Sequence, residues 1–539
     1  MIISGFYNYA TETNKIISCN AFTKTVGDNY ACIACNKNDL DPEVLADSFL
    51  NKGIISVNNN KSGMFLMVVY KGQSLHLISD IYSSPWNMYY TETEVGFYYS
   101  TSLRTLLTLS EIKRNVNLTS ARIFLQRGFL IDNNTLIKGV NRLSFAQEVI
   151  VKKNGYKVNH YKYKLDNTKL STEEAEKQLL PTIESSIQKY IPKDGSNVYM
   201  PLSNGFDSNL ILNTVRKYHS SDIHVFTIGG SIGRNEIPKV RKNIVDFANV
   251  HLHTFIVDEE LLKFFPDIVW RLEGALYEGG VFLQYALGRI AKETGASMML
   301  CGECADEYLK QTYQNDMRLA ITGRHKANVR FYPRANPFLS AHCIILKKSA
   351  LMMNSFNIPC SYPYVSNKLS NIADNLKKEN GFDKALYKEL CCKKFPEVIA
   401  ANVKSTGGST DEQAILSIRM HEILKSFVNE SDLIQKIALL KYNTKQYSWK
   451  NEYIRILTEY PELNKVYKIT YATINYIVSN MNSLYGGRRG LPEDSMSQLL
   501  TKLYLIIFEE LFISGKYDNR FKKDEFPTSL FDLLKDIDK

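Results

Sequence analysis

The residues with the clearest chemical potential lie in a short polar loop at 203–208. The chain runs Tyr-Met-Pro-Leu over 199–202, then Ser-Asn-Gly-Phe-Asp-Ser over 203–208, and continues into the largely apolar stretch 209–215. This pattern predicts a strand, a tight loop and a helix, with the loop amides and the helix start forming a nest for an anion. Asp207 is positioned to hold Mg²⁺ on that anion. The loop lacks the Gly-Lys-Ser/Thr ending of a Walker A sequence, which disfavours an enzyme that cleaves the β–γ bond of a nucleotide.

A second polar cluster follows the apolar run 297–300 and reads Cys-Gly-Glu-Cys-Ala-Asp-Glu over 301–307. At the end of a strand, Gly302 would let the backbone approach a nucleotide closely, and Asp306 offers a second carboxylate for magnesium. Cys301 and Cys304 also have the spacing of a metal or redox pair. One such pair cannot complete a zinc tetrahedron, and the other Cys-x-x-Cys, at 32–35, is expected in a different domain, so the nucleotide interpretation is preferred.

The elements that must position these clusters form a predicted parallel sheet. Short apolar strands near 198, at 223–228 and at 253–257 alternate with helical patterns at 172–191 and 235–248. This alternation predicts parallel strands with right-handed crossovers, whose ligand lies at the carboxyl ends of the strands.

The flanking regions have different patterns. Short β-branched or aromatic runs, divided by Gly, Asn and Asp turns, predict an antiparallel β-rich N-terminal domain; they lie at 62–70, 74–79, 96–100 and 147–152. Amphipathic helical patterns dominate the end of the chain. We therefore expect an α/β protein with a β-rich domain at 1–165, a parallel-sheet domain at 170–410 and a helical extension at 411–539.

Composition narrows the class of protein. The chain has 539 residues, of which 44% are hydrophobic, so a globular protein with more than one domain is expected. Its nine cysteines are irregularly spaced, which favours reduced thiols. The net charge of +10 is spread along the chain and accompanied by no nucleic-acid-binding motif. The sequence contains no apolar run of about 18 residues and no signal-peptide pattern, so we expect a cytoplasmic protein with no membrane or nucleic-acid partner.

Three motifs carry a resemblance to a known family. The loop 203–208 resembles the Ser-Gly-Gly-x-Asp-Ser pyrophosphate loop of N-type ATP pyrophosphatases, and 301–307 resembles the Ser-Gly-Glu-Gly-Ala-Asp-Glu motif of asparagine synthetases. A late helix and loop in that family carry two lysines around a proline. Lys384 lies twelve residues before Pro396, and Lys404 lies eight after it. Over residues 1–410 the chain is identified as a member of the asparagine synthetase superfamily, with an adenine-nucleotide-hydrolase-like synthetase domain.

The resemblance implies ATP and Mg²⁺ as cofactors and a specific chemistry. A carboxylate would be activated as an acyl-adenylate with release of pyrophosphate, and a nitrogen nucleophile would then form an amide. Asp207 and Asp306 would hold the metal, Lys404 would stabilise charge on the α-phosphate, Lys384 would assist at the phosphates, and Glu303 would orient or deprotonate the amine. The residues expected around the pyrophosphate and nucleotide are Leu202, Ser203, Asn204, Gly205, Phe206, Asp207, Ser208, Ile228, Cys301 and Gly302.

The N-terminal domain resembles the Ntn-hydrolase-like glutaminase domain of asparagine synthetases in the order of Ser79-Asp80, Pro85, Tyr89-Tyr90 and Phe97 to Thr101 ahead of a leucine-rich helix. Active glutaminases of this class carry a cysteine after the initiator methionine, and its α-amino group serves as base. Ile2 stands there, and Ser4 and Cys19 lie too far along the chain to replace it. We therefore predict that this domain does not hydrolyse glutamine.

Departures from the family pattern bear on the substrates. Asn204 replaces a glycine and would add a side chain beside the phosphates. The segment 359–366 lacks the acidic and arginine positions of the family sequence Glu-Ala-Arg-Val-Pro-Phe-Leu-Asp, which makes aspartate an unsuitable substrate. With Ile2, this favours an amine other than glutamine-derived ammonia, as in β-lactam synthetases and lasso-peptide cyclases. Glu303 matches the asparagine-forming branch instead, since β-lactam synthetases have tyrosine there.

Three hypotheses follow for the function. The first is an AMP-forming ligase acting on a peptide or small-molecule carboxylate and an amine, with a precursor peptide or a biosynthetic protein as partner. The second is an amidotransferase that uses ammonia on a small or sugar carboxylate. The third is a catalytically silent nucleotide-binding protein.

Overall fold

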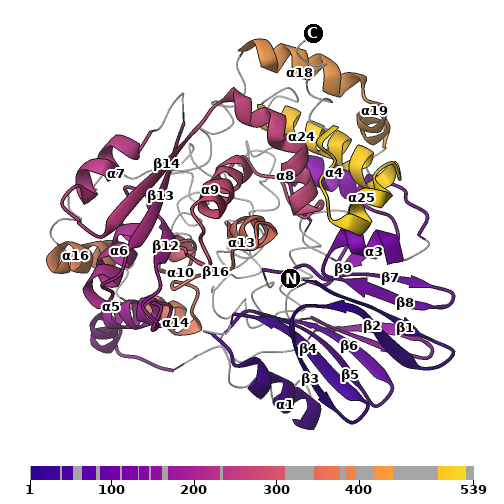
Figure 1. The fold of residues 1–539 in the computed structure, drawn as a ribbon, viewed down its shortest axis with the longest axis horizontal. Coiled ribbons are helices and arrows are strands. Elements are labelled where there is room, and N and C mark those ends of the chain that lie inside the picture. The colour runs from indigo at the N-terminus through magenta and orange to yellow at the C-terminus, as the bar shows by residue number, and fades with distance from the viewer. Residues whose placement is uncertain are drawn as a thin grey trace.

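The protein is a mixed α/β structure with antiparallel sheets in its N-terminal region and parallel strands later in the chain (Figure 1). The computed structural model describes residues 2–36, 39–52, 63–80, 85–109, 112–130, 133–144, 147–160, 168–230, 235–309, 345–376, 384–395, 418–440 and 496–529. Within these ranges, no helix has the length and apolar character needed to span a membrane.

Two antiparallel sheets make up the N-terminal region. The five-stranded sheet has the order β2-β1-β8-β7-β9, with β1 Ile3–Asn8, β2 Thr13–Cys19, β7 Tyr89–Thr93, β8 Gly96–Ser100 and β9 Asn141–Arg142. The six-stranded sheet has the order β11-β10-β6-β5-β4-β3, with β3 Phe22–Val26, β4 Asn29–Cys35, β5 Phe65–Lys71, β6 Ser74–Ser79, β10 Gln147–Lys152 and β11 Gly155–His160. The prediction of antiparallel β-structure here is confirmed.

Alternating side chains explain why these two sheets face each other. Ile3 and Tyr7 of β1 are fully buried and share one core with Val68 of β5 and Leu77 of β6. The opposite face of the six-stranded sheet buries Ala31, Met67 and Ile78 against the helix α1 (Pro42–Lys52). Because the side chains of a strand alternate between faces, β5 serves both cores.

The parallel strands form the predicted second region. β12 (Val198–Pro201), β13 (Ile223–Gly230) and β14 (Val250–Val257) pair in parallel in that order, and β15 (Met299–Leu300) pairs in parallel with β16 (Cys360–Ser361). One face of the sheet packs with α5 (Thr172–Gln188), α6 (Phe206–Tyr218) and α7 (Ile237–Ile244). The other face packs with α8 (Phe265–Leu272) and α9 (Val281–Glu293). The parallel α/β arrangement is therefore confirmed.

Helix α5 begins where the sequence dictates. Ser171 accepts a hydrogen bond from the Glu174 amide, and the Glu174 carboxylate accepts one from the Ser171 amide, which forms a capping box. The buried residues Ala175, Leu179 and Ile183 then follow at intervals of four along one face of the helix.

Helices from the end of the chain pack against the N-terminal region. They are α18 (Ile418–Glu430), α19 (Asp432–Leu439), α24 (Met496–Phe508), a following π-helix at Glu509–Ile513 and α25 (Asp518–Lys523). α24 contacts both α4 (Leu118–Arg127) and α8, and α25 contacts α3 (Leu103–Leu109). Residues 441–495 of the predicted helical extension lie outside the described residues.

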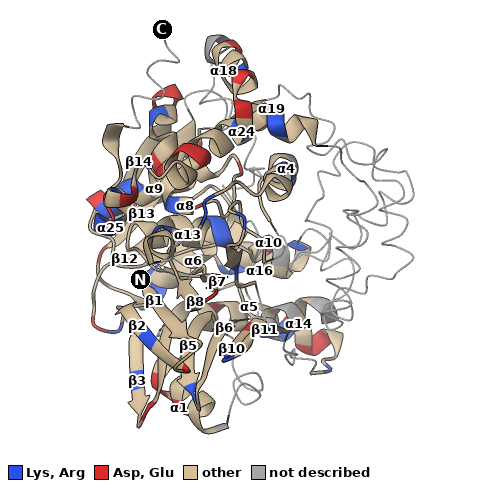
Figure 2. Cartoon of the chain, turned by 90° about the vertical axis from the view of Figure 1, so that its right-hand side faces the viewer, with Lys and Arg blue, Asp and Glu red and all other residues tan. Residues whose placement is uncertain are grey.

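Charge is mixed over the described elements. Acidic and basic side chains are interspersed along the helices and sheets in the view of Figure 2, with both signs present on the N-terminal strands and on the C-terminal helices. The spread of charge predicted from the sequence is thus visible in the folded chain.

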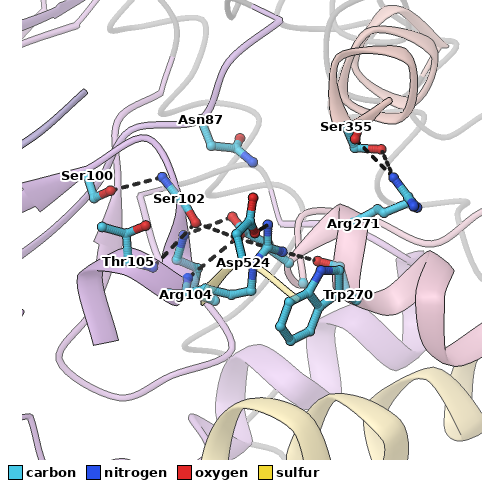
Figure 3. A network of polar contacts seen from close by, with 12 residues as sticks. Asn87, Ser100, Ser102, Arg104, Thr105, Trp270, Arg271, Ser355 and Asp524 are labelled. Carbon is cyan, nitrogen blue, oxygen red and sulfur yellow. Dashed lines mark hydrogen bonds and ion pairs between the residues drawn. The ribbon is translucent and has the colours of Figure 1, made fainter. Parts of the chain in front are cut away.

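A polar cluster around Arg104 of α3 joins this helix to Trp270 of α8 and to Asp524 (Figure 3). Glu273, which adopts a left-handed backbone (φ 50°), accepts hydrogen bonds from Ser102 Oγ at 2.9 Å and from the Leu103 amide at 2.8 Å. Arg104 bonds to Glu273 at 3.1 Å, to the Trp270 carbonyl at 2.6 Å and to Asp524 at 3.0 Å. The cluster therefore ties α3 to α8 and to the residue that ends α25.

Candidate active site

The loop 203–208 emerges from β12 with the predicted strand–loop–helix geometry. The Leu202 amide donates to the Phe226 carbonyl at 2.8 Å, and Thr227 Oγ1 donates to the Leu202 carbonyl at 2.8 Å. Leu202 is buried, and Ile228 lies two residues beyond Phe226 on β13. The loop therefore begins at the carboxyl end of the sheet, where ligands of parallel sheets bind.

Hydroxyl groups hold the loop in a tight turn. Ser208 Oγ lies 3.0 Å from Ser203 Oγ and 3.1 Å from the Ser203 amide, and the Gly205 amide donates to Ser203 Oγ at 3.1 Å. Asn209 Nδ2 donates to the carbonyls of Ser203 and Gly205. Gly205 is the N-cap of α6 and supplies no side-chain hydrogen bond, and Phe206 is the first residue of the helix. This leaves the helix start suited to an anion.

Asn204 is held by the neighbouring helix. Its side chain is buried, its Oδ1 accepts from Asn243 Nδ2 at 3.1 Å, and its amide donates to Glu236 Oε2 at 2.9 Å. These contacts fasten the loop to α7, and the place of Asn204 beside the phosphates stays a prediction.

The two predicted metal ligands converge on one ammonium group. Lys384 Nζ lies 2.7 and 2.8 Å from the two carboxylate oxygens of Asp207 and 2.7 Å from Asp306 Oδ1. The lysine is 5% exposed and directly precedes α16 (Ala385–Lys394). Burial lowers the pKa of Lys384, but the charges of Asp207 and Asp306 outweigh burial and raise it above its ordinary value. Lys384 therefore contacts the carboxylates, and contact with phosphates stays a prediction.

The donor set at this position fits Mg²⁺. Asp207 and Asp306 face a single cation, and Mg²⁺ is usually bound by one or two carboxylates together with water and substrate phosphates. Among the described residues, no group of three or more His, Cys, Asp or Glu side chains could hold a metal. A site with two carboxylates, and with no third such ligand among the described residues, would suit a metal ion that binds together with a nucleotide.

The cluster 301–307 lies against the loop. The Cys301 amide donates to the Ser361 carbonyl at 2.9 Å, which extends the pairing of β15 with β16. A Cβ atom added to Gly302 would lie 3.6 Å from the Ser208 amide nitrogen and 3.7 Å from the Asp207 carbonyl carbon. These are ordinary contact distances, so the protein alone does not require glycine here. The fold has brought together two motifs that are far apart in the sequence.

Glu303 has an unpaired buried oxygen. Its Oε1 accepts a long hydrogen bond from Gln284 Nε2 at 3.4 Å, while Oε2 is buried with no hydrogen-bond partner among the described residues. Burial raises the pKa of Glu303, and a backbone hydrogen bond and the charge of Lys348 only partly oppose this. Lys348 itself pairs with Glu278 at 2.6 Å. A buried carboxyl oxygen without a partner is costly and suits a group that receives a substrate proton.

Several contacts around the site carried no recognisable sequence motif. Tyr364 donates a hydrogen bond from its hydroxyl to the Asp207 carbonyl at 2.9 Å, and its hydroxyl lies 2.9 Å from that of Tyr387. Both tyrosines are fully buried, so they fix Asp207 to α16 and to the segment 359–366. Tyr364 lies in the segment 359–366, which was compared with the family sequence. That comparison is the sequence signal that could have identified Tyr364 as a residue near the site. Lys404 lies outside the described residues.

The sheet, the loop and the paired carboxylates define an α/β domain built to bind a ligand at the carboxyl ends of parallel strands. Residues 185–336 match the family model for asparagine synthase. This match supports membership of residues 185–336 in the asparagine synthetase superfamily, and the class of enzyme it indicates is an ATP-dependent amide or carbon–nitrogen ligase.

Comparisons of the whole chain are less specific. A search of curated proteins finds no match. The U34-tRNA thiolase NcsA from Methanococcus maripaludis, solved with its [4Fe-4S] cluster, aligns with 17% identity over 45% of this chain and 86% of its own, with a TM-score of 0.19. The glutamine phosphoribosylpyrophosphate amidotransferase from B. subtilis, complexed with ADP and GMP, aligns with 9% identity over 43% of this chain and 73% of its own, with a TM-score of 0.20.

Proposed function

We propose that the chain is an AMP-forming ligase that activates a carboxylate with ATP and joins it to an amine, in the maturation of a peptide or natural product. The observation that carries the proposal is the convergence of Asp207 and Asp306 on the ammonium of Lys384. Two carboxylates at the carboxyl end of a parallel sheet, beside a helix N-terminus, suit the departing pyrophosphate and its counter-ion.

The adenylation step assigns roles to the loop and its neighbours. The substrate carboxylate oxygen attacks the α-phosphorus, and the bond from that phosphorus to the bridging oxygen of the β-phosphate breaks. The amides at the start of α6 and the hydroxyls of Ser203 and Ser208 would bind the pyrophosphate, and Asp207 and Asp306 would hold the Mg²⁺ that neutralises its charge. Lys404 would stabilise charge on the α-phosphate.

The amide-forming step depends on Glu303. The amine nitrogen attacks the acyl carbon, AMP leaves, and the proton lost from nitrogen needs an acceptor. Glu303 Oε2 is buried and has no hydrogen-bond partner among the described residues. Burial raises the pKa of Glu303 toward neutral pH, which makes its carboxylate a stronger base. The Gln284 amide holds the other oxygen and would orient the carboxyl group.

Neighbouring residues hold the beginning of β1 in place. The Ile2 amide donates to Asn20 Oδ1 at 2.6 Å, and Ser4 is fully buried within β1. We propose that the N-terminal region has a structural or docking role and that the chain acts in the cytoplasm with a precursor peptide or a biosynthetic protein.

A second candidate is an amidotransferase that takes free ammonia to a small or sugar carboxylate. The observation in its favour is Glu303, which matches the asparagine-forming branch of the family. The two candidates differ in the nucleophile and share the adenylation step.

Release of pyrophosphate tests the shared step. ATP, Mg²⁺ and a panel of carboxylic acids and peptides are incubated with the full chain, and pyrophosphate and AMP are measured. At least one acid should elicit both products, and Asp207→Asn or Asp306→Asn should lower the rate by at least about 10²-fold. Asp222→Asn is the matched control, because Asp222 is an exposed residue that pairs with His251 before β13. ATP binding with no turnover for any acid would leave the chain a silent nucleotide-binding protein.

A further inference from the structure

Two cysteines and a threonine meet where the two N-terminal sheets come together. Cys19 ends β2 of the five-stranded sheet, whereas Cys32 lies in β4 of the six-stranded sheet, opposite Thr23 of β3. Thr23 Oγ1 lies 3.4 Å from Cys19 Sγ and 3.5 Å from Cys32 Sγ. Cys32 belongs to the buried core between the sheets, and Cys19 packs against that core. Thirteen positions apart in the chain, they are neighbours in space because the strands β3 and β4 turn back on β2.

The two thiols differ in exposure and acidity. Cys19 is partly exposed, whereas Cys32 is fully buried. Contact with Cys32 and, to a smaller extent, the Thr23 hydroxyl lower the pKa of the Cys19 thiol, against the effect of burial. The same contact with Cys19, together with burial, raises the pKa of Cys32. These shifts favour the thiolate at Cys19 and the protonated thiol at Cys32. A reachable thiolate beside a buried thiol is the arrangement of an attacking and a resolving cysteine.

We propose that Cys19 and Cys32 form a redox-active dithiol, which hydrogen peroxide converts into a disulfide between the two sheets. The Cys19 thiolate attacks one peroxide oxygen, the O–O bond breaks, and the departing hydroxide takes up a proton to form water. Cys19 is now a sulfenic acid. The Cys32 sulfur then attacks the Cys19 sulfur, the S–O bond breaks, and the hydroxide leaves as a second water with the Cys32 proton. Two thiols are oxidised and one peroxide is reduced.

The disulfide would act on the start of the chain. Cys19 pairs with Ile3 of β1, and the Asn20 amide donates to the Ile2 carbonyl at 3.0 Å. A covalent bond from Cys19 to β4 therefore fixes the beginning of β1 against the six-stranded sheet. Closing this loop restricts the unfolded chain, so the oxidised protein should unfold at a higher temperature than the reduced protein.

A second thiol pair serves as the internal control. Cys301 directly follows β15 and Cys360 lies in the paired strand β16, but burial raises the pKa of Cys301. If the proximity of two thiols were sufficient, both pairs would react with peroxide at similar rates. If thiolate character is required, Cys19 should react faster.

The first experiment compares the two pairs in one molecule. The reduced full chain is treated at neutral pH with one equivalent of hydrogen peroxide, remaining thiols are alkylated, and peptide mass mapping locates the disulfides. The Cys19–Cys32 disulfide should form at least about 10-fold faster than any bond involving Cys301. Equal rates, or a disulfide that joins Cys19 to another cysteine, would overturn the proposal.

The second experiment uses variants that keep the strands intact. In Cys32→Ser, a sulfenic-acid-specific probe should label Cys19, because no resolving thiol is present; in Cys19→Ser no disulfide should form at Cys32. Thr23→Val should slow the alkylation of Cys19 by iodoacetamide, since a hydroxyl that lowers its pKa is lost. Circular dichroism verifies that each variant is folded. In the unmodified chain, Cys19 should be alkylated faster than Cys392, a partly exposed thiol on α16. Alkylation of Cys19 at the rate of Cys392 or more slowly would contradict the proposal.

Discussion

The ammonium of Lys384 neutralises only part of the charge that Asp207 and Asp306 bring together. One positive charge between two carboxylates leaves a net negative charge, and a divalent cation would remove it. A Mg²⁺ ion at the proposed site would therefore compete with Lys384 for the same oxygens. In the productive state the metal would take the carboxylates and the lysine would be released toward the phosphates, which reconciles the observed contacts with the role predicted from the sequence.

Lys384→Met should separate these two functions. We expect pyrophosphate release to fall by at least about 10²-fold, because a cation at the phosphates is lost. At the same time Mg²⁺ should raise the unfolding temperature of the variant at a concentration about 10-fold lower than for the unmodified chain, because the competing ammonium is absent. Lys393→Met is the control, since Lys393 lies on the same helix in an exposed pair with Glu389. An unchanged Mg²⁺ dependence would show that the carboxylates do not bind the metal.

The carboxyl group of Glu303 sets the pH dependence of turnover. Burial raises its pKa, so the base is lost, and the rate falls, as the pH falls through that raised value. Lys348 opposes the rise, and Lys348→Met should therefore move the acid limb of the kcat/KM profile to higher pH. Glu303→Gln should lower kcat by about 10²–10⁴-fold and abolish that limb. An acid limb that stays in place in both variants would remove Glu303 from the mechanism.

Sequence motifs identified the residues that lie close together because each motif follows a strand of the same sheet. The loop 203–208 and the cluster 301–307 each follow a strand of one parallel sheet, so their convergence follows from topology. Side-chain partners across elements were not predictable, because they depend on strand register and helix rotation. Tyr364 on the Asp207 carbonyl and Lys348 on Glu278 are examples. Cys301 likewise follows the strand that is paired with the strand of Cys360, although Cys304 is its neighbour in the Cys-x-x-Cys sequence.

At the scale of elements, the parallel sheet carries an unusual aromatic and imidazole surface. Tyr199 of β12 stacks on His224 of β13, and His224 Nδ1 lies 3.0 Å from His253 Nε2 of β14. His251 approaches the same ring, with centroids 5.2 Å apart. Strand registry produces the cluster, since His224 is paired with His251 and Phe226 with His253. Three imidazoles in contact cannot all accept a proton at low cost.

This histidine cluster should make the protein less stable in mild acid. Burial and the neighbouring histidines lower the pKa of His224 and of His253 below the ordinary value of 6.5. The unfolded chain therefore binds more protons than the folded chain, and the free energy of unfolding decreases as the pH falls from the ordinary value through the lowered ones. Thermal unfolding at about pH 5.5 should occur at a lower temperature than at about pH 7.5.

Variants separate this effect from general acid sensitivity. His253→Gln should reduce the difference in unfolding temperature between the two pH values, because one pair of opposed imidazoles is removed. His421→Gln, on α18, is the control and should leave the difference unchanged. An equal response in the two variants would mean that the cluster does not control acid stability.

At the scale of the whole molecule, one core joins distant parts of the chain. A single buried cluster contains Phe124 of α4, Phe265 of α8, Phe282 of α9 and Tyr504 of α24. These helices, which come from before residue 165, from the parallel-sheet region and from the end of the chain, therefore cannot unfold fully without exposing a common apolar surface. The cluster includes residues on both sides of the domain limits expected at 165 and 411, and those limits stay a prediction.

The polar cluster around Glu273 should control how strongly these parts are coupled (Figure 3). Arg104 stacks 4.4 Å from the centre of the Trp270 ring while it bonds to Glu273 and Asp524. Glu273→Ala would leave the partly buried Arg104 and the start of α3 without the buried carboxylate that both contact, so the free energy of unfolding should fall by about 3 kcal/mol. Hydrogen exchange should show faster exchange in both α3 and α25, with little change in β12–β14. Asp524→Asn is the matched control and should cost less than about 1 kcal/mol, because Asp524 is 63% exposed. Faster exchange in α3 alone would show that the cluster caps one helix and does not connect the N-terminal sheets to the C-terminal helices.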